Sequence, residues 1–214
     1  MKGIKVLGLG AALILLVLSL LALGCKSEVE TGDEIPIPNA NFTQLDDSYN
    51  TGARYWNNKN RNGPTSDTEW DIRVDTTVKR GNSNSLRVSD NGYPTPWART
   101  WVFVEEGGVK AGATYILSAY VRTSGSAKGR VLAQYWTKDP SVTKDQIFRT
   151  PQRVDLGTEY LFLNFTEGVK DDGNWVKDEL MFTVPSNAAY VEICPYNEGE
   201  GTVWYTDFEL KEVK

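Results

Sequence analysis

The sequence contains no histidine and only two cysteines, Cys25 and Cys194, in 214 residues. Without histidine, the chain cannot form a Ser-His-Asp or Cys-His catalytic arrangement or a His-based metal site. Two cysteines so far apart form no zinc-type cluster and suggest no disulfide framework. A Gly-x-Ser-x-Gly motif and a phosphate-binding loop are also missing. These absences argue against the common hydrolases and metalloenzymes, and we expect no catalytic residues and no enzyme activity.

The sequence also lacks a run of basic residues. It carries 23 Lys and Arg against 28 Asp and Glu, a net charge of −5. Two of the bases, Lys2 and Lys5, belong to an N-terminal segment that we expect to be removed, which leaves 21 − 28 = −7. Phosphate backbones and anionic surfaces repel such a charge. Nucleic acid is therefore not an expected partner.

The N-terminus carries the only long apolar run. Lys2 and Lys5 precede apolar residues 6–23, and Cys25 follows directly before a polar stretch. This order resembles a bacterial lipoprotein signal, although Ala22 stands three residues before the cysteine, where leucine is more usual. We expect residues 1–24 to be a signal peptide and Cys25 to become the lipid-bearing N-terminus, which anchors the protein to a membrane at the cell envelope, outside the cytoplasm. The alternatives are an uncleaved membrane anchor and an ordinary secreted protein.

The segment after the cysteine has few apolar residues. Residues 25–38 are acidic and end in Pro36 and Pro38, which is typical of an extended tether. The folded part is then expected over residues 39–214. This length suits a single domain with one complete core.

No stretch of twelve residues shows helical periodicity with good helix formers. The ordered segments are instead short, rich in Thr, Val, Tyr and Trp, and separated by turns. Over residues 113–123, for example, Tyr115, Leu117, Ala119 and Val121 share one parity. Strands are predicted for residues 70–78, 85–88, 97–105, 113–123, 130–136, 153–156, 159–166, 175–184, 189–194 and 202–213. The fold class is therefore all-β, a sandwich of two antiparallel sheets.

Four blocks of this sequence, in this order, are similar to those of a known family. They are Asn-x-x-Phe at residues 39–42, Gly-x-x-x-Ser-Leu-Arg-Val at 81–88, the strand at 109–122 and Gly-Thr-Val-Trp-Tyr-Thr-Asp-Phe-Glu-Leu at 201–210. Together they resemble CenC-type carbohydrate-binding modules, families 4 and 9, which belong to the galactose-binding-like jelly rolls. The resemblance spans residues 39 to 212. It implies a jelly-roll β-sandwich and non-catalytic carbohydrate binding.

The resemblance also implies a structural calcium ion, held by acids in the family. Here Thr43 stands where family members often have an acid after the phenylalanine, and Thr206 replaces the first of two acids in the last strand. Asp207 remains. The expected cofactor is therefore at most one structural calcium, with Asp207 as the only side chain to name, because calcium prefers hard oxygen ligands. A solvated strand position is the alternative for Asp207.

Aromatic residues are abundant, with 7 Trp and 10 Tyr. A protein binds a sugar by stacking a ring on its C–H face and by placing amide, carboxylate or guanidinium groups at its hydroxyls. Tyr120 lies two residues from Arg122 on the polar side of its strand, which suggests an aromatic platform beside a donor fork. On the next strand, either Gln134 and Trp136 or Ala133 and Tyr135 point toward the binding groove, and we favour Gln134 and Trp136 as the sugar-binding pair. Further candidates are the loop aromatics Trp56, Tyr93, Trp97 and Trp175, whose alternative is a ring folded over the edge of the sandwich.

The leading expectation is thus a lipid-anchored module that binds a polysaccharide or oligosaccharide at the cell envelope. A structural lipoprotein that uses the same sandwich to bind an envelope protein is the second hypothesis. A small polysaccharide lyase or hydrolase is the third, since some jelly-roll lyases use Tyr, Arg or Lys. The sequence does not identify the glycan.

Overall fold

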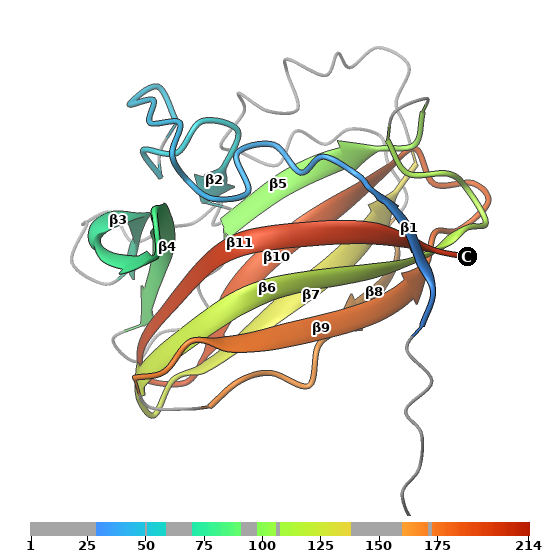
Figure 1. Ribbon diagram of the computed structural model, residues 1–214. Coiled ribbons are helices and arrows are strands. Elements are labelled where there is room, and N and C mark those ends of the chain that lie inside the picture. The colour runs from blue at the N-terminus through green and yellow to red at the C-terminus, as the bar shows by residue number, and fades with distance from the viewer. Residues whose placement is uncertain are drawn as a thin grey trace, which may run out of the picture. The chain divides into compact units, whose positions relative to one another are not determined.

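The computed structural model describes residues 29–49, 51–58, 70–90, 98–105, 108–137, 160–170 and 173–214. The chain separates into two compact units, residues 1–30 and residues 31–214, and only the second is described at length. Its described part contains strands and no helix (Figure 1). No helix with the length and apolarity needed to cross a membrane is found among the described residues. The predicted strand at 153–156 lies outside these residues.

The strands form two antiparallel sheets, as predicted. The six-stranded sheet has the order β3-β4-β11-β6-β9, with β1 also paired to β11, and the five-stranded sheet has the order β2-β5-β10-β7-β8. In Figure 1, β11, β6 and β9 lie in front of β10, β7 and β8. The strands are β1 (Thr31–Glu34), β2 (Asn57–Asn58), β3 (Trp70–Arg80), β4 (Ser83–Asp90), β5 (Ala98–Phe103), β6 (Thr114–Gly125), β7 (Lys128–Trp136), β8 (Tyr160–Phe165), β9 (Val176–Thr183), β10 (Tyr190–Glu198) and β11 (Gly201–Val213).

The core lies between the two sheets. In β6, Tyr115, Leu117, Ala119 and Val121 are fully buried, which confirms the alternation predicted for residues 113–123. The inner face of the opposite sheet contributes alternate residues of its central strands, among them Tyr135 and Val191. The buried hydroxyl of Tyr205 in β11 donates to the carbonyls of Tyr196 and Arg130, so the two sheets are also joined by hydrogen bonds.

The sandwich begins earlier than predicted. Residues 31–38 were expected to belong to the tether, but β1 pairs antiparallel with β11, with Thr31 opposite Val213 and Glu34 opposite Lys211. Ile37 is also buried in the core. The prediction was wrong because it used apolar content, whereas a short edge strand is held by backbone hydrogen bonds that need no apolar side chains.

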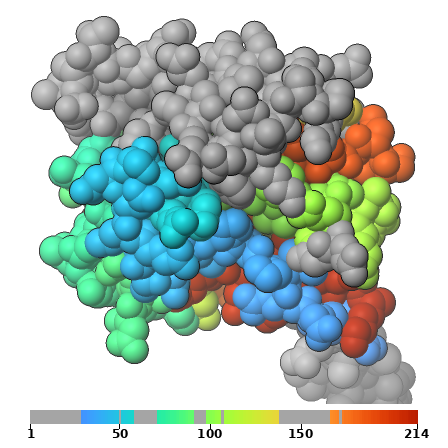
Figure 2. Space-filling view, turned by 90° about the horizontal axis from the view of Figure 1, so that it is seen from above, coloured from blue at the N-terminus to red at the C-terminus, as the bar shows by residue number. Residues whose placement is uncertain are grey.

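The long strand β11 organises the six-stranded sheet. It pairs with β6 along one edge, while its other edge pairs with β4 over its first half and with β1 near its end. Its register with β6 shifts between Thr206 and Glu209, where Asp207 has a φ of 50°. At this irregularity Phe208 N donates to the carbonyl of Ala40. Figure 2 shows the segment after β1 (blue to cyan) beside β3 and β4 (green).

Candidate functional site

The outer face of the five-stranded sheet carries a set of aromatic and charged side chains that point away from the core. Because the inner parities of β5, β10 and β7 belong to the core, the opposite parities face outward. We call this set the aromatic face. It comprises Arg99, Trp101 and Phe103 of β5, Tyr190 and Glu192 of β10, and Gln134 and Trp136 of β7.

Cross-strand register places these side chains in two rows. Tyr190 lies between Phe103 and Trp136, and Glu192 lies between Trp101 and Gln134. The Trp101 and Tyr190 rings meet edge to face, with centroids 5.1 Å apart and an interplanar angle of 89°. These rings and Trp136 form a hydrophobic cluster separate from the main core. The aromatic face is therefore a second packed layer with polar groups inside it.

A carboxylate and a guanidinium lie at the centre of the aromatic face. Glu192 accepts a hydrogen bond of 3.0 Å from Trp136 Nε1, and its other oxygen lies 3.5 Å from Arg99 Nη1. Arg99 also lies near the Trp101 ring, with its guanidinium carbon 5.4 Å from the ring centre. Glu192 is 0 % exposed and Arg99 is 3 % exposed. Each polar group is thus positioned beside a ring, as sugar recognition requires.

The structure settles which parity of β7 faces outward. Ala133 and Tyr135 lie in the core, whereas Gln134 and Trp136, the pair favoured for sugar binding, lie on the outer face. Their role in sugar binding stays a prediction. Both are nearly buried, at 3 % and 5 % exposed.

Tyr120 and Arg122 lie on the other sheet and Trp175 lies directly before its strand β9, so the predicted groove residues do not come together in one groove. Tyr120 and Arg122 project from the outer face of β6, away from the buried Val121. The Tyr120 ring does not present an open platform, because the guanidinium carbon of Arg80 lies 3.3 Å from its centre. Trp175 precedes β9 and donates to the carbonyl of Lys79 at 3.3 Å.

The assignment of Trp56 as an exposed sugar-binding ring is wrong. Trp56 is 0 % exposed and packs against Phe42 and Phe208, with ring centroids at 5.0 and 5.1 Å. Its Nε1 donates to the carbonyl of Pro38, which satisfies the one polar group of the ring. The loop that carries Trp56 packs into the core because burial removes the large apolar surface of the ring from water. Tyr93, Trp97 and Cys25 lie outside the described residues.

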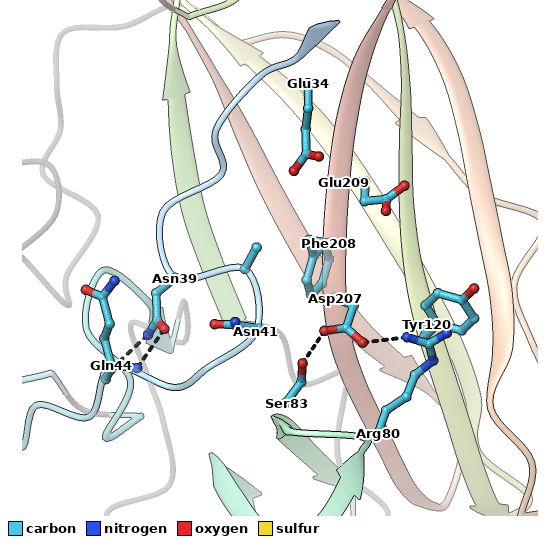
Figure 3. Close-up of a pocket in the computed structure, with 11 residues that line it drawn as sticks. Glu34, Asn39, Asn41, Gln44, Arg80, Ser83, Tyr120, Asp207, Phe208 and Glu209 are labelled. Carbon is cyan, nitrogen blue, oxygen red and sulfur yellow. Dashed lines mark hydrogen bonds and ion pairs between the residues drawn. The ribbon is translucent and has the colours of Figure 1, made fainter.

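Asp207, the predicted calcium ligand, lines a polar cavity of about 600 Å³ (Figure 3). Its carboxylate accepts a hydrogen bond from Ser83 Oγ and pairs with Arg80 Nη1 at 2.8 Å. Among the described residues, no three or more His, Cys, Asp or Glu side chains are placed so that they could hold a metal ion together. The carboxylate is therefore already paired with a cation from the chain itself, and a calcium ion at Asp207 stays a prediction.

Trp101, Tyr190, Arg99 and Glu192 were not singled out from the sequence. A signal was present, because residues 98–103 alternate between small or aliphatic side chains and the series Arg99, Trp101 and Phe103. Which parity faces the core depends on pairing with a strand about ninety residues later, so the alternation alone could not assign the site.

Solved structures with a similar fold include carbohydrate-binding modules. No protein-family model matches the chain, and a search of curated proteins finds no match. The xylan-binding CBM22-1 domain of Paenibacillus barcinonensis Xyn10C is similar over 86 % of this chain and 97 % of its own, with 11 % identity and a TM-score of 0.51. The Clostridium thermocellum xylanase 10B CBM22-1-GH10 structure, complexed with xylohexaose, is similar over 85 % of this chain, with 10 % identity and a TM-score of 0.52.

This chain spans only 28 % of that xylanase chain. The enzymatically active domain of the bacteriophage CBA120 tailspike protein 4 is similar over 74 % of this chain and 19 % of its own, with 9 % identity and a TM-score of 0.52. At these identities the likeness concerns the fold. The described protein is an all-β sandwich of two antiparallel sheets that resembles the jelly rolls of carbohydrate-binding modules.

Proposed function

We propose that this protein is a non-catalytic carbohydrate-binding module that binds a polysaccharide or oligosaccharide on the aromatic face. The observation that carries the proposal is the cluster of Trp101, Tyr190 and Trp136 beside the Glu192 carboxylate. The rings supply stacking surfaces for sugar C–H groups, and Glu192, Gln134 and Arg99 supply acceptors and donors for hydroxyls. The CenC-like blocks in the sequence agree with this assignment.

Stability alone does not account for the charged pair in this face. Removing a carboxylate and a guanidinium from water costs several kcal/mol per ion, and apolar residues of similar size usually serve stability as well or better. Arg99 and Glu192 nevertheless lie together, at most 3 % exposed, outside the main core. Polar groups held rigidly among aromatic rings are typical of a ligand site, where they fix the orientation of the sugar.

Access to the face is part of the proposal. The aromatic-face side chains whose burial is described are at most 5 % exposed, except for the half-buried Phe103. A glycan therefore reaches them only in a conformation in which this face is open. Binding then selects or induces the open state, and the ligand's affinity for that state must exceed the cost of opening.

Xylans are the first ligands to test. The P. barcinonensis domain is described as xylan-binding, and the C. thermocellum structure contains xylohexaose. Both structures have a fold similar to that of this chain, but this likeness does not extend to the residues of the aromatic face. The panel of glycans to be tested therefore also includes glucans, mannans and galactans. A chain of neutral sugars suits a face whose charges, Arg99 and Glu192, largely neutralise each other.

The lipid anchor at the cell envelope belongs to the same proposal. Lipidation of Cys25 would fix the module outside the cytoplasm, where polysaccharides occur. Replacing Cys25 with Ser tests this step, because the variant should lose labelling by a fatty-acid precursor and leave the membrane fraction. Unchanged labelling and fractionation would refute lipidation at Cys25 and leave the sugar-binding proposal to its own test.

The decisive experiment is titration of the purified protein with the glycan panel, followed by tryptophan fluorescence and calorimetry. One glycan class should bind saturably, and Trp101→Ala and Trp136→Phe should weaken it by about tenfold or more, the typical effect of losing one stacking or hydrogen-bonding group. Trp175→Ala, directly before β9 of the other sheet, is the matched control and should bind normally. No binding to any glycan by a folded protein would contradict the proposal and favour the envelope-protein partner, and released reducing or unsaturated ends would favour the lyase or hydrolase.

A further inference from the structure

A second set of aromatic and cationic side chains lies on the outer face of the six-stranded sheet, opposite the aromatic face. Trp204 of β11 projects outward between the buried Val203 and Tyr205. Its cross-strand neighbours are Arg87 of β4 on one side and Arg122 of β6 on the other. We call Arg87, Trp204 and Arg122 the Trp204 row. All three are half-buried, so part of each residue is exposed to solvent.

The indole of Trp204 is held in place by an acid. Its Nε1 donates to Asp75 Oδ2 at 3.0 Å, and Oδ1 of the same carboxylate accepts from the hydroxyl and backbone N–H of Thr77. With both carboxylate oxygens occupied, Asp75 fixes the ring. A ring whose orientation is set before the ligand arrives loses little entropy on binding.

The arginines of this face differ in how their charge is balanced. Arg73 and Arg87 both pair with Asp71, and Arg80 pairs with Asp207. Arg122 forms no ion pair with any described residue, and its guanidinium carbon lies 5.9 Å from the centre of the Trp204 ring. Among the described residues, the positive charge of the Trp204 row that lacks an acidic partner is therefore that of Arg122, beside the Trp204 ring.

Hydroxyl groups lie in the neighbouring row of the same face. Thr202 stands two residues before Trp204 and has Ser89 and Ser124 as cross-strand partners. The Ser89 and Thr202 hydroxyls are 2.9 Å apart. Hydroxyls can both donate and accept, so this row can exchange hydrogen bonds with sugar hydroxyls while a neighbouring sugar lies over the indole.

We propose that the Trp204 row is a second glycan site that binds acidic sugars, with the uronic acid carboxylate at Arg122 and the pyranose ring against Trp204. A planar guanidinium matches a carboxylate with two parallel hydrogen bonds, and this geometry favours a uronate over a neutral sugar. This site consists of different residues from the aromatic face and lies on the opposite sheet. Binding at the Trp204 row can therefore be tested independently of binding at the aromatic face.

The test uses trigalacturonate and its methyl ester, which have the same skeleton and differ in charge. Calorimetry on the full chain in a mild detergent should show binding of the acid at least about tenfold tighter than the ester, the loss expected for a charge-assisted hydrogen bond. Raising the salt concentration should reduce the difference in affinity between the acid and the ester, because salt screens charges at a half-exposed site. Equal affinities for acid and ester would overturn the proposal.

Variants locate the binding. Arg122→Gln should abolish the preference for the acid, whereas Arg122→Lys should keep part of it, since it retains the charge and loses the planar fork. Arg73→Gln is the matched control, because Arg73 is exposed and pairs with Asp71. A preference that survives in Arg122→Gln, or falls equally in Arg73→Gln, would overturn the assignment. Neutral xylo-oligosaccharides should bind all three variants alike, which separates this site from the aromatic face.

Discussion

Arg80 and Asp207 are 127 residues apart in the chain, and their side chains meet at 2.8 Å. The contact ties the turn between β3 and β4 to the middle of β11. It is reinforced by Ser83 Oγ, which donates to the second carboxylate oxygen, and by Tyr120 beneath the guanidinium. A cation supplied by the chain thus neutralises the acid at the irregularity of β11, the position where the CenC-like resemblance implied a calcium ion (Figure 3).

The first prediction concerns calcium. Because Asp207 is already paired with Arg80, neither calcium nor a chelator should change the melting temperature of the protein. Arg80→Gln should lower the stability by about 1–2 kcal/mol, the range for a partly exposed charge-assisted hydrogen bond. For a domain of this size this corresponds to a shift of about 3–6 °C in Tm. Differential scanning calorimetry measures both effects.

Arg73→Gln provides the control for charge, because Arg73 lies on the same strand and is 65 % exposed. It should leave the melting temperature nearly unchanged. A rise of several degrees with calcium in the unmodified protein would show that a metal displaces Arg80 and would contradict this account.

The second prediction concerns acid stability at Asp75. Partial burial raises the pKa of this carboxyl, but hydrogen bonds from the Thr77 side chain, the backbone of Val78 and Thr77, and Trp204 outweigh it and lower the pKa from 3.8 to about 2. A carboxyl with a depressed folded pKa stabilises the fold above its unfolded pKa and stops doing so as the pH falls through the folded pKa. This contribution, about 1 kcal/mol after allowance for solvent screening, should disappear between about pH 4 and pH 2.

Asp75→Asn tests this dependence. The variant should be less stable than the unmodified protein at neutral pH, and the gap in urea midpoint should close as the pH approaches 2. The exposed Asp33 in β1 offers Asp33→Asn as a control, which should show no such gap. A gap that stays constant from pH 7 to pH 2 would mean that the carboxylate charge has no part in holding Trp204.

The third prediction concerns Trp56, which lies in the core. Trp56→Ala should cost about 3–5 kcal/mol of stability, as large-to-small core substitutions do. Trp56→Phe should cost less, because the remaining ring can still pack against Phe42 and Phe208. Under conditions where either variant is folded, glycan affinity should be unchanged. Loss of binding with unchanged urea midpoint would instead restore Trp56 as a ligand residue.

The fourth prediction concerns the hydrogen bond between Trp136 and Glu192. A double-mutant cycle with Trp136→Phe and Glu192→Gln should give a coupling free energy of about 1.5–3 kcal/mol in unfolding measurements, because the acceptor is charged and buried. Each single variant should also weaken glycan binding. Additive effects on stability would show that the contact is not a coupled pair.

The sequence was sufficient for the strands whose side chains alternate clearly. Residues 113–123 and 202–213 were predicted to be strands, and β6 and β11 confirm both within two residues at either end. These segments carry β-branched and aromatic residues at regular spacing, and the core selects one parity. The strand β1 was missed because its stability comes from backbone pairing with β11, which leaves no apolar pattern.

The candidate site was predictable only in part. Gln134 and Trp136, the pair favoured for sugar binding, face away from the core, but Trp101 and Glu192 were not grouped with them. That grouping depends on which strands become neighbours, and long-range pairing has no local signature. For the same reason Tyr120 was matched with Arg122 along the chain, whereas in space Arg80 covers Tyr120, and Trp204 is the ring beside Arg122.

The pairing of Thr31 with Val213 would also limit how far the sandwich can move from a lipid anchor at Cys25. If Cys25 carries the lipid, six peptide steps separate it from the first strand, an extended reach of about 20 Å. A fold that began at Asn39 would have left fourteen steps, or about 50 Å. With a lipid at Cys25, this short connection would hold the edge of the sandwich formed by β1 and the end of β11 near the lipid headgroups. Such a module would sample a thin layer next to the membrane and would favour glycans that are presented there.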